Sequence, residues 1–215
     1  MENIISIWPT NFIFEQKASE ATPEFLKEII AIGEEYEAMH PEAHVPVAMR
    51  KSNIETTYNL LSDERPAAQI FKKMIKDRMT SLAIVEGFYN PDKVVFEGST
   101  SLRKFAPGEY AKPHNHRSVD YVAVLWVDLE VTDHANNPTH QKLAGNRLHM
   151  IDPIAARSRL LNHKMCWPVS PVPGTFVIHP ASVYHTSEMN IGNKDTIALV
   201  TNIKVAETVR NYVKL

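Results

Sequence analysis

Two distant stretches of the chain follow one plan, in which a predicted strand and a turn containing Pro and Gly lead to histidine and then to a buried strand. The first stretch carries His114 and His116 and continues into the apolar run 121–128, and the second carries His185 and continues into 196–205. Alternate residues of a strand point to the same face, so His114 and His116 can offer two imidazoles to one ion. A facing strand would add a third imidazole from His185. The repeated plan therefore predicts strands that enclose a site for a single metal ion.

From residue 93 onward the chain has the character of a β protein. Short segments rich in β-branched and aromatic residues are separated by turns that contain Pro, Gly or Asn. Seven or eight short antiparallel strands that close round a core predict a jelly roll or barrel. The predicted strands are 94–97, 100–105, 121–128, 146–151, 166–170, 174–179 and 196–205, with 183–187 as an eighth.

The first 92 residues predict a helical layer with an entry strand, formed by short apolar segments, that supports the β core. Thr22 and Pro23 predict the start of one helix, because Thr can cap a helix and Pro is favoured at its first position. Apolar residues at three- and four-residue steps predict a second helix from about 62 to 82. A chain of 215 residues with no repeat or linker predicts one domain, with 1–92 as a helical support region and 93–215 as the β core.

Composition and charge exclude several classes of function. The 23 basic and 25 acidic residues leave a net charge of −2, too little to attract nucleic acid or an anionic membrane. The single cysteine, Cys166, excludes an internal disulfide framework and a thiolate metal cluster. Glu2 and Pro9 argue against a signal peptide, and no apolar run is long enough for a membrane span. We therefore expect a cytoplasmic protein that acts on a small molecule or peptide, without nucleic-acid or membrane partners, and a homodimer stays open.

Both histidine stretches resemble the two cupin motifs. The first motif is matched by the spacing of Gly108, His114, His116 and an acid, with Asp120 in the place of the usual glutamate. The second motif is matched around His185, with serine where glycine is usual. The residues that match the second motif are Gly174, Pro180, Ser182 and His185.

A resemblance that covers nearly the whole chain is to the 2-oxoglutarate and Fe(II)-dependent oxygenases of the prolyl hydroxylase-like group found in bacteria and phages. Members of this family and the cupins share the double-stranded β-helix, a form of jelly roll, so the resemblance implies a mainly β fold of this kind with an N-terminal helical layer. Four elements match in the same order along the chain. They are Trp8-Pro9 after an apolar segment, His114-Asn115-His116 with the buried strand 122–126, Asp152-Pro153, and Gly174 through Pro180-Ala181-Ser182 to His185.

The resemblance implies Fe(II) as the metal, 2-oxoglutarate as the cosubstrate and O₂ as the oxidant. We expect His114, His116 and His185 to hold the iron, with Asp120 as the alternative third ligand, because such sites commonly use two histidines and one carboxylate. No catalytic residue beyond the metal ligands is expected. His179 either lines the same pocket or fills it. The remaining isolated histidines of the β region are expected to be structural, namely His134, His140, His149 and His163.

The chain departs from this family where the cosubstrate binds. These oxygenases generally place arginine about ten residues after the last histidine, to pair with the far carboxylate of 2-oxoglutarate. Thr196 stands at that place, and Lys194 lies two residues earlier. Lysine can hold a carboxylate as a point charge. The residues that we consider for cosubstrate binding are Lys194, Arg103, Tyr110, Thr196 and Asn202.

The expected function is that of a non-haem Fe(II) and 2-oxoglutarate-dependent oxygenase that hydroxylates a small molecule or a peptide side chain. Two alternatives remain open at this point. One is a cupin-type dioxygenase or isomerase that acts on a metal-chelated substrate without 2-oxoglutarate. The other is a β-barrel that binds a metal or small ligand without catalysis.

Overall fold

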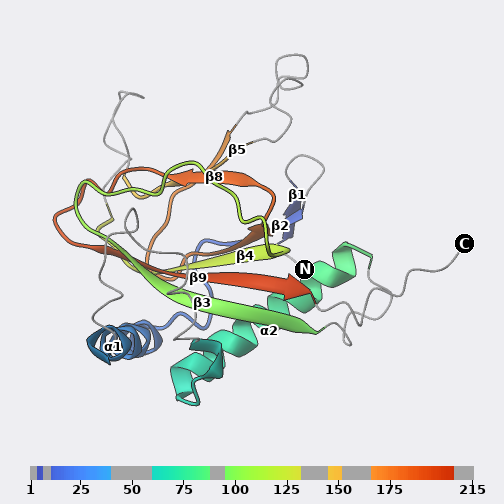
Figure 1. The fold of residues 1–215 in the computed structure, drawn as a ribbon, viewed down its shortest axis with the longest axis horizontal. Helices are drawn as coiled ribbons and strands as arrows, with labels where there is room; N and C mark the ends of the chain where they lie inside the picture. Colours follow the sequence, from blue (N-terminus) through green and yellow to red (C-terminus); the bar gives the residue numbers. More distant parts are fainter. Residues whose placement is uncertain are drawn as a thin grey trace, which may run out of the picture.

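The computed structural model describes residues 4–6, 11–39, 60–87, 95–131, 145–151 and 166–205. Two helices and nine strands lie in this part of the chain, with one short 3₁₀ turn before the second helix (Figure 1). In chain order they are β1 (Ile4–Ser6), β2 (Asn11–Glu15), α1 (Pro23–Met39), η4 (Leu60–Ser62), α2 (Pro66–Val85), β3 (Phe96–Phe105), β4 (Tyr121–Asp128), β5 (Leu148–Ile151), β6 (Cys166–Val169), β7 (Phe176–Pro180), β8 (Tyr184–Ser187) and β9 (Thr196–Val205).

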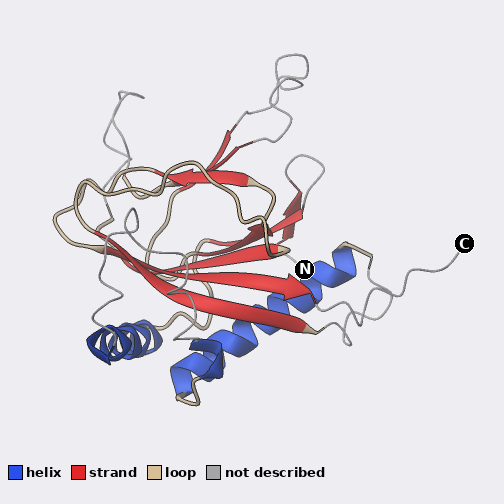
Figure 2. Cartoon of the chain, in the orientation of Figure 1, coloured by secondary structure: helices blue, strands red, loops and turns tan. Residues whose placement is uncertain are grey.

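The strands form two antiparallel sheets that face each other. The large sheet has the order β1-β2-β7-β4-β9-β3, and the small sheet has the order β6-β5-β8. Both helices lie on the side of the large sheet that faces away from the small one (Figure 2). This arrangement confirms the predicted mainly β fold with a helical layer, in which two sheets close as a double-stranded β-helix.

Alternation along the strands separates two cores, because successive side chains point to opposite faces of a sheet. One core, here the helix-facing core, lies between the large sheet and the helices, and the other, the inner core, lies between the two sheets. The helix-facing core includes Phe25, Ile29, Phe71, Met74, Ala123, Leu125, Ile178 and Leu199. The inner core includes Phe12, Val122, Val124, Trp126, Met150, Val177, Val183 and Ala198.

The region before residue 93 contributes strands as well as helices. β2 pairs antiparallel with β7, and β1 pairs with β2, so both strands extend the large sheet. α1 begins as predicted, since the Phe25 backbone N–H donates to Thr22 Oγ1 at 3.2 Å and Pro23 stands at the first helical position. α2 begins at Pro66, later than predicted, because the chain first makes the η4 turn.

The two strands predicted at 94–97 and 100–105 form a single continuous strand. β3 runs without a break through Gly98 and pairs residue by residue with β9, from Phe96 with Val205 to Phe105 with Thr196. Gly98 was expected to interrupt the strand. Its missing side chain instead makes room for Leu61, whose Cδ1 would lie 2.7 Å from a Cβ at this position. The other predicted strands are confirmed within two residues, and those at 121–128 and 196–205 agree with the observed bounds.

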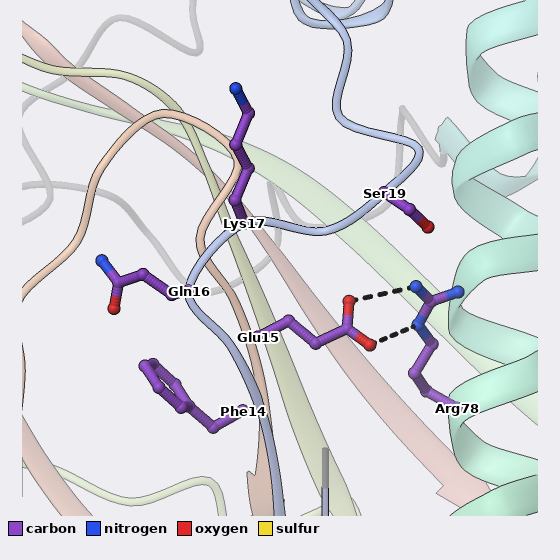
Figure 3. A pocket seen from close by; sticks show the side chains of 6 residues that line it. All are labelled: Phe14, Glu15, Gln16, Lys17, Ser19 and Arg78. Atoms are coloured by element: carbon purple, nitrogen blue, oxygen red, sulfur yellow. Dashed lines mark hydrogen bonds and ion pairs between the residues drawn. The ribbon is translucent and has the colours of Figure 1, made fainter. Parts of the chain in front are cut away.

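A buried ion-pair network ties α2 to the strand and turn that cross it. Figure 3 shows the guanidinium of Arg78 facing the carboxylate of Glu15, with two hydrogen bonds of 3.1 and 3.0 Å. The same guanidinium donates to both carboxylate oxygens of Glu20, at 2.5 and 2.7 Å. Only 14% of the Arg78 side chain and 7% of the Glu15 side chain are exposed. Since charges this deeply buried need partners, the network fixes where α2 lies on the large sheet.

No helix in the described part of the chain is both long enough and apolar enough to cross a membrane. Several histidines considered above lie outside the described residues, namely His134, His140 and His163.

Candidate metal centre

Two segments remote in sequence are joined where the histidines meet. His114 forms an isolated antiparallel bridge with His185 on β8, and each of the two residues donates its backbone N–H to the carbonyl of the other at 2.9 Å. The backbone N–H of His116 donates to the carbonyl of Ala181 at 2.9 Å. The prediction that His114 and His116 lie on one regular strand is therefore wrong. A bridge and one further hydrogen bond place them instead.

The three predicted ligands come together at one end of the inner core. One ring nitrogen from each lies within 4.8 Å of the other two, so the three residues could together hold one metal ion. The ring centroids of His114 and His185 are 4.3 Å apart, and that of His116 lies 5.2 Å from His114 and 5.3 Å from His185. We call His114, His116 and His185 the histidine cluster.

Backbone carbonyls set the tautomer of two of these rings. His114 Nδ1 lies 2.6 Å from the Lys112 carbonyl oxygen, and His185 Nδ1 lies 3.1 Å from the Val183 carbonyl oxygen. A carbonyl only accepts hydrogen bonds, so Nδ1 carries the proton in each ring and Nε2 keeps its lone pair. This is the arrangement by which proteins orient metal-binding histidines.

Burial keeps His185 in the neutral form that binds metals. Desolvation is the main cause that lowers the pKa of His185, to about 2, and the neighbouring histidines lower it further. An imidazole must be unprotonated to coordinate an ion. The donor set therefore suits a divalent transition metal, and three imidazoles leave the charge of such an ion uncompensated.

Asp120, the alternative third ligand, lies outside the histidine cluster. Its Oδ2 accepts the backbone N–H of Val205 at 2.8 Å, and its own backbone N–H donates to the Ile203 carbonyl. The carboxylate thus contributes to the junction between β9 and the start of β4. Among the described residues, the donor set that lies together contains three histidines and no carboxylate.

His179 is a fourth histidine at the same end of the barrel. It lies on β7, its side chain is completely buried, and its ring centroid is 4.7 Å from that of His185 in an edge-to-face arrangement. The ring of His179 is therefore in contact with a member of the histidine cluster and closed off from solvent. The signal in the sequence was the alternation of β7, which places His179 on the same face as the inner-core residue Val177.

Two candidates for cosubstrate binding are engaged elsewhere. Lys194 Nζ lies 2.7 Å from Asp128 Oδ1 in a half-exposed ion pair. Thr196 is buried, and its hydroxyl donates to Asn146 Oδ1 at 2.7 Å. Tyr110 is 49% exposed. These three side chains do not converge in the way that a carboxylate site needs.

The other two candidates lie on the face of the large sheet that lines the inner core. Arg103 of β3 pairs in register with Ala198, and Ala198 pairs with Trp126, both of which belong to that core. Residues directly opposite each other in a sheet project to the same face, so Arg103 projects there too. Asn202 pairs with Val122 of the inner core, and its Oδ1 is buried and finds no hydrogen-bond partner among the residues described.

His149 has the structural role expected of it. Its Nε2 lies 2.7 Å from Glu188 Oε1, and its Nδ1 lies 3.1 Å from Cys166 Sγ. Glu188 in turn is held by Arg147 through hydrogen bonds of 2.7 to 3.0 Å. Burial raises the pKa of the Cys166 thiol, so this group is not set up as a nucleophile.

Comparison with known proteins supports the fold through solved structures and not through sequence matches. No family model matches the chain, and no curated protein matches it in sequence. Solved structures match it well beyond chance. A prolyl-4-hydroxylase from Pseudomonas putida superposes with a TM-score of 0.52 at 16% identity, covering 85% of this chain and 82% of that one. This chain has the fold of the 2-oxoglutarate and Fe(II) oxygenases.

Two further structures agree. The non-heme monooxygenase ThoJ, solved as a nickel complex, gives a TM-score of 0.57 at 13% identity, covering 90% of this chain and 73% of that one. The non-heme alpha-ketoglutarate-dependent carbocyclase SnoK from nogalamycin biosynthesis gives a TM-score of 0.53 at 11% identity, covering 89% and 78%. Identities this low establish the shared fold and not a shared reaction.

Proposed function

We propose that this protein is a non-haem Fe(II) and 2-oxoglutarate-dependent oxygenase that hydroxylates a small molecule or a peptide side chain. The observation that carries the proposal is the histidine cluster, which lies at the end of the inner core of a fold shared with such oxygenases. The three donor nitrogens are close enough for one ion, and two of the rings have their Nε2 lone pair set by backbone carbonyls. Three protein ligands leave coordination positions for other molecules.

The neutral donor set supports an anionic cosubstrate. When bound, Fe(II) and 2-oxoglutarate together supply the oxidising chemistry that activates O₂ and releases succinate and CO₂. Three imidazoles, in place of two imidazoles and a carboxylate, leave the metal site one charge more positive. That charge favours a 2-oxo acid, which binds as an anion.

Arg103 is the best-placed cation for the far carboxylate of that cosubstrate. The register of β3 with β9 directs Arg103 to the inner core, and Lys194 lies near the surface. Arginine also offers two parallel donors to a carboxylate. We therefore propose that Arg103 has the role that arginine at the position of Thr196 has in the family.

The experiment that tests the function measures succinate formed from 2-oxoglutarate by the Fe(II)-loaded protein under air, with ascorbate supplying the two electrons that a substrate would otherwise give. His114→Ala and His185→Ala should each weaken Fe(II) binding by at least about tenfold, because a lost ligand costs no less than a lost partner of a ligand. Both variants should abolish succinate formation. Tyr184→Phe, a change at an exposed residue of β8, is the matched control and should leave Fe(II) binding unchanged. Iron binding that survives in both alanine variants would reject the site.

The all-histidine donor set also favours a second candidate. A cupin-type dioxygenase or isomerase binds its substrate directly to the metal and needs no cation for 2-oxoglutarate. The absence of a carboxylate from the cluster of described residues fits that class equally well. Anaerobic titration of the Fe(II) protein separates the two candidates, since 2-oxoglutarate that chelates Fe(II) produces a metal-to-ligand charge-transfer absorption band. Iron binding without this band at millimolar 2-oxoglutarate would favour the second candidate.

A further inference from the structure

His179 occupies a position where a polar side chain is costly. It is fully buried on β7, and in register it lies opposite Val122 of the inner core. The ring contacts His185 edge to face, with 4.7 Å between centroids. A phenylalanine would fill the same space without a polar atom. The presence of histidine therefore calls for a partner for both of its nitrogens.

One ring nitrogen of His179 has a hydrogen-bond partner, and this partner determines which of the two nitrogens carries the proton. His179 Nδ1 lies 2.9 Å from the carbonyl oxygen of Pro180. Because a carbonyl oxygen only accepts, Nδ1 carries the proton, and Nε2 presents a lone pair. Nε2 is buried and has no hydrogen-bond partner among the described residues. A buried acceptor left in this state is rare in native proteins and usually indicates a bound water, ion or ligand.

The missing partner is a donor and not the metal itself. The nitrogens that lie within 4.8 Å of one another belong to His114, His116 and His185, and His179 is not a member of this group. His179 is thus next to the metal position and outside the set of ligands. A lone pair in that place can accept a hydrogen bond from a group that the metal holds.

A second acceptor lies on the same row of the sheet. Val122 pairs with His179 on one side and with Asn202 on the other, so all three project to the inner core. Asn202 Oδ1 is buried and has no hydrogen-bond partner in the part of the chain that the structure describes. Neighbouring strands are about 4.8 Å apart, which places the two side chains on strands about 10 Å apart. The inner core thus presents two buried polar side chains on one row of the large sheet.

We propose that His179 Nε2 accepts a hydrogen bond from a proton-bearing group bound to the metal, which is a metal-bound water beside 2-oxoglutarate or a chelating ligand that carries its own N–H or O–H. The inference rests on the metal site of the proposed function and deepens it, since it names a proton-bearing group that the site accepts in addition to the 2-oxo acid. His179 is a positioning residue for that ligand. The donor is either the chelating ligand or a metal-bound water.

The test uses the Co(II)-substituted protein and two chelating probes of known structure. Acetohydroxamate keeps an N–H beside its chelating oxygens, whereas oxalate carries no proton at neutral pH. Visible absorption of Co(II) reports the binding of either probe without any turnover. The variants are His179→Phe, which removes the acceptor while filling the space, and His179→Gln, which restores an acceptor oxygen.

The expected result is a change in selectivity. His179→Phe should weaken acetohydroxamate binding by about fivefold to tenfold, the usual range for the loss of one hydrogen bond, and should change oxalate binding by less than about twofold. His179→Gln should recover part of the loss. Co(II) affinity should stay within about threefold of wild type in both variants, because His179 is not a ligand.

Each alternative outcome has a definite meaning. If the donor is a metal-bound water, His179→Phe will shift the pH midpoint of the Co(II) spectrum without added probe, which also supports the proposal. Equal effects on both probes with no such shift would overturn it, and so would a fall in Co(II) affinity as large as that of His185→Ala. A wild-type protein that binds no Co(II) would instead reject the metal site and, with it, the proposed function.

Discussion

Replacing Arg78 with methionine should destabilise the protein more than any change of a surface charge. Methionine keeps most of the apolar volume of the side chain and removes the guanidinium, which makes four hydrogen bonds to Glu15 and Glu20. The carboxylate of Glu15, 7% exposed, would then be buried without its cation. Removing one partner of a buried ion pair costs about 3–5 kcal/mol. We expect a value near the lower end, about 3 kcal/mol, because the Glu20 side chain is 29% exposed and can regain water.

The assay is urea denaturation followed by far-UV circular dichroism. With a denaturant slope of about 2 kcal/mol per M, the Arg78→Met midpoint should fall by about 1.5 M. Lys73→Met is the matched control, because the Lys73–Asp77 pair lies on the same helix and is exposed. An exposed pair of this kind contributes about 0.3–0.5 kcal/mol.

A second substitution, at Glu15, should restore part of the stability that Arg78→Met removes. Glu15→Gln combined with Arg78→Met should recover part of the lost stability, since no charge of that pair then stays buried without its partner. The reasoning is refuted if Arg78→Met costs no more than Lys73→Met. It is equally refuted if the double variant is as unstable as the sum of its single changes.

Three further predictions concern the site and the pH dependence. His116→Ala should weaken Fe(II) binding more than Asp120→Ala, as measured by parallel metal titrations; the reverse order would indicate a carboxylate ligand. Arg103→Met should weaken 2-oxoglutarate binding, followed by the charge-transfer band, more than Lys194→Ala, and equal effects would reject Arg103 as the counter-ion. Burial raises the pKa of Glu20, but the hydrogen bonds and charge of Arg78 outweigh burial and hold this pKa below its usual value of 4.5. The Glu20–Arg78 ion pair therefore stabilises the protein above pH 4.5, and this contribution is lost as the pH falls further. Urea midpoints measured from pH 7 to pH 3 should show this loss in wild type and a smaller loss in Arg78→Met.

The sequence was most informative where function and strand patterning coincide. The spacing of His114, His116 and His185 within repeated strand-and-turn stretches predicted three residues whose donor nitrogens lie together. β4 and β9 were predicted with the right bounds, because long β-branched runs leave few other conformations. These features depend on local pattern, which a single sequence records directly.

The sequence was less informative where distant contacts decide the structure. The sequence predicted a break in the strand near Gly98, but the strand continues through it, and the missing side chain makes room for Leu61. Asp120 has the right spacing for a ligand, but its carboxylate accepts the backbone N–H of Val205, a contact across 85 residues. The environment of Arg103 follows from its register with Ala198, which depends on the pairing of the whole strand. Such properties belong to the assembled sheet.

The bridge between His114 and His185 would make a bound metal ion a cross-link between two distant parts of the chain. These residues are 71 positions apart in the chain, and the segment around His114 is attached to the rest of the barrel by backbone contacts with His185, Ala181 and Ser187. An ion shared by both histidines would close a long loop, and it would bind the native state in preference to the unfolded chain. Filling the site would therefore raise thermal stability in step with metal concentration. A protease should cut near His114 sooner in the metal-free protein than in the loaded one, so occupation of this site would also control how long the protein survives.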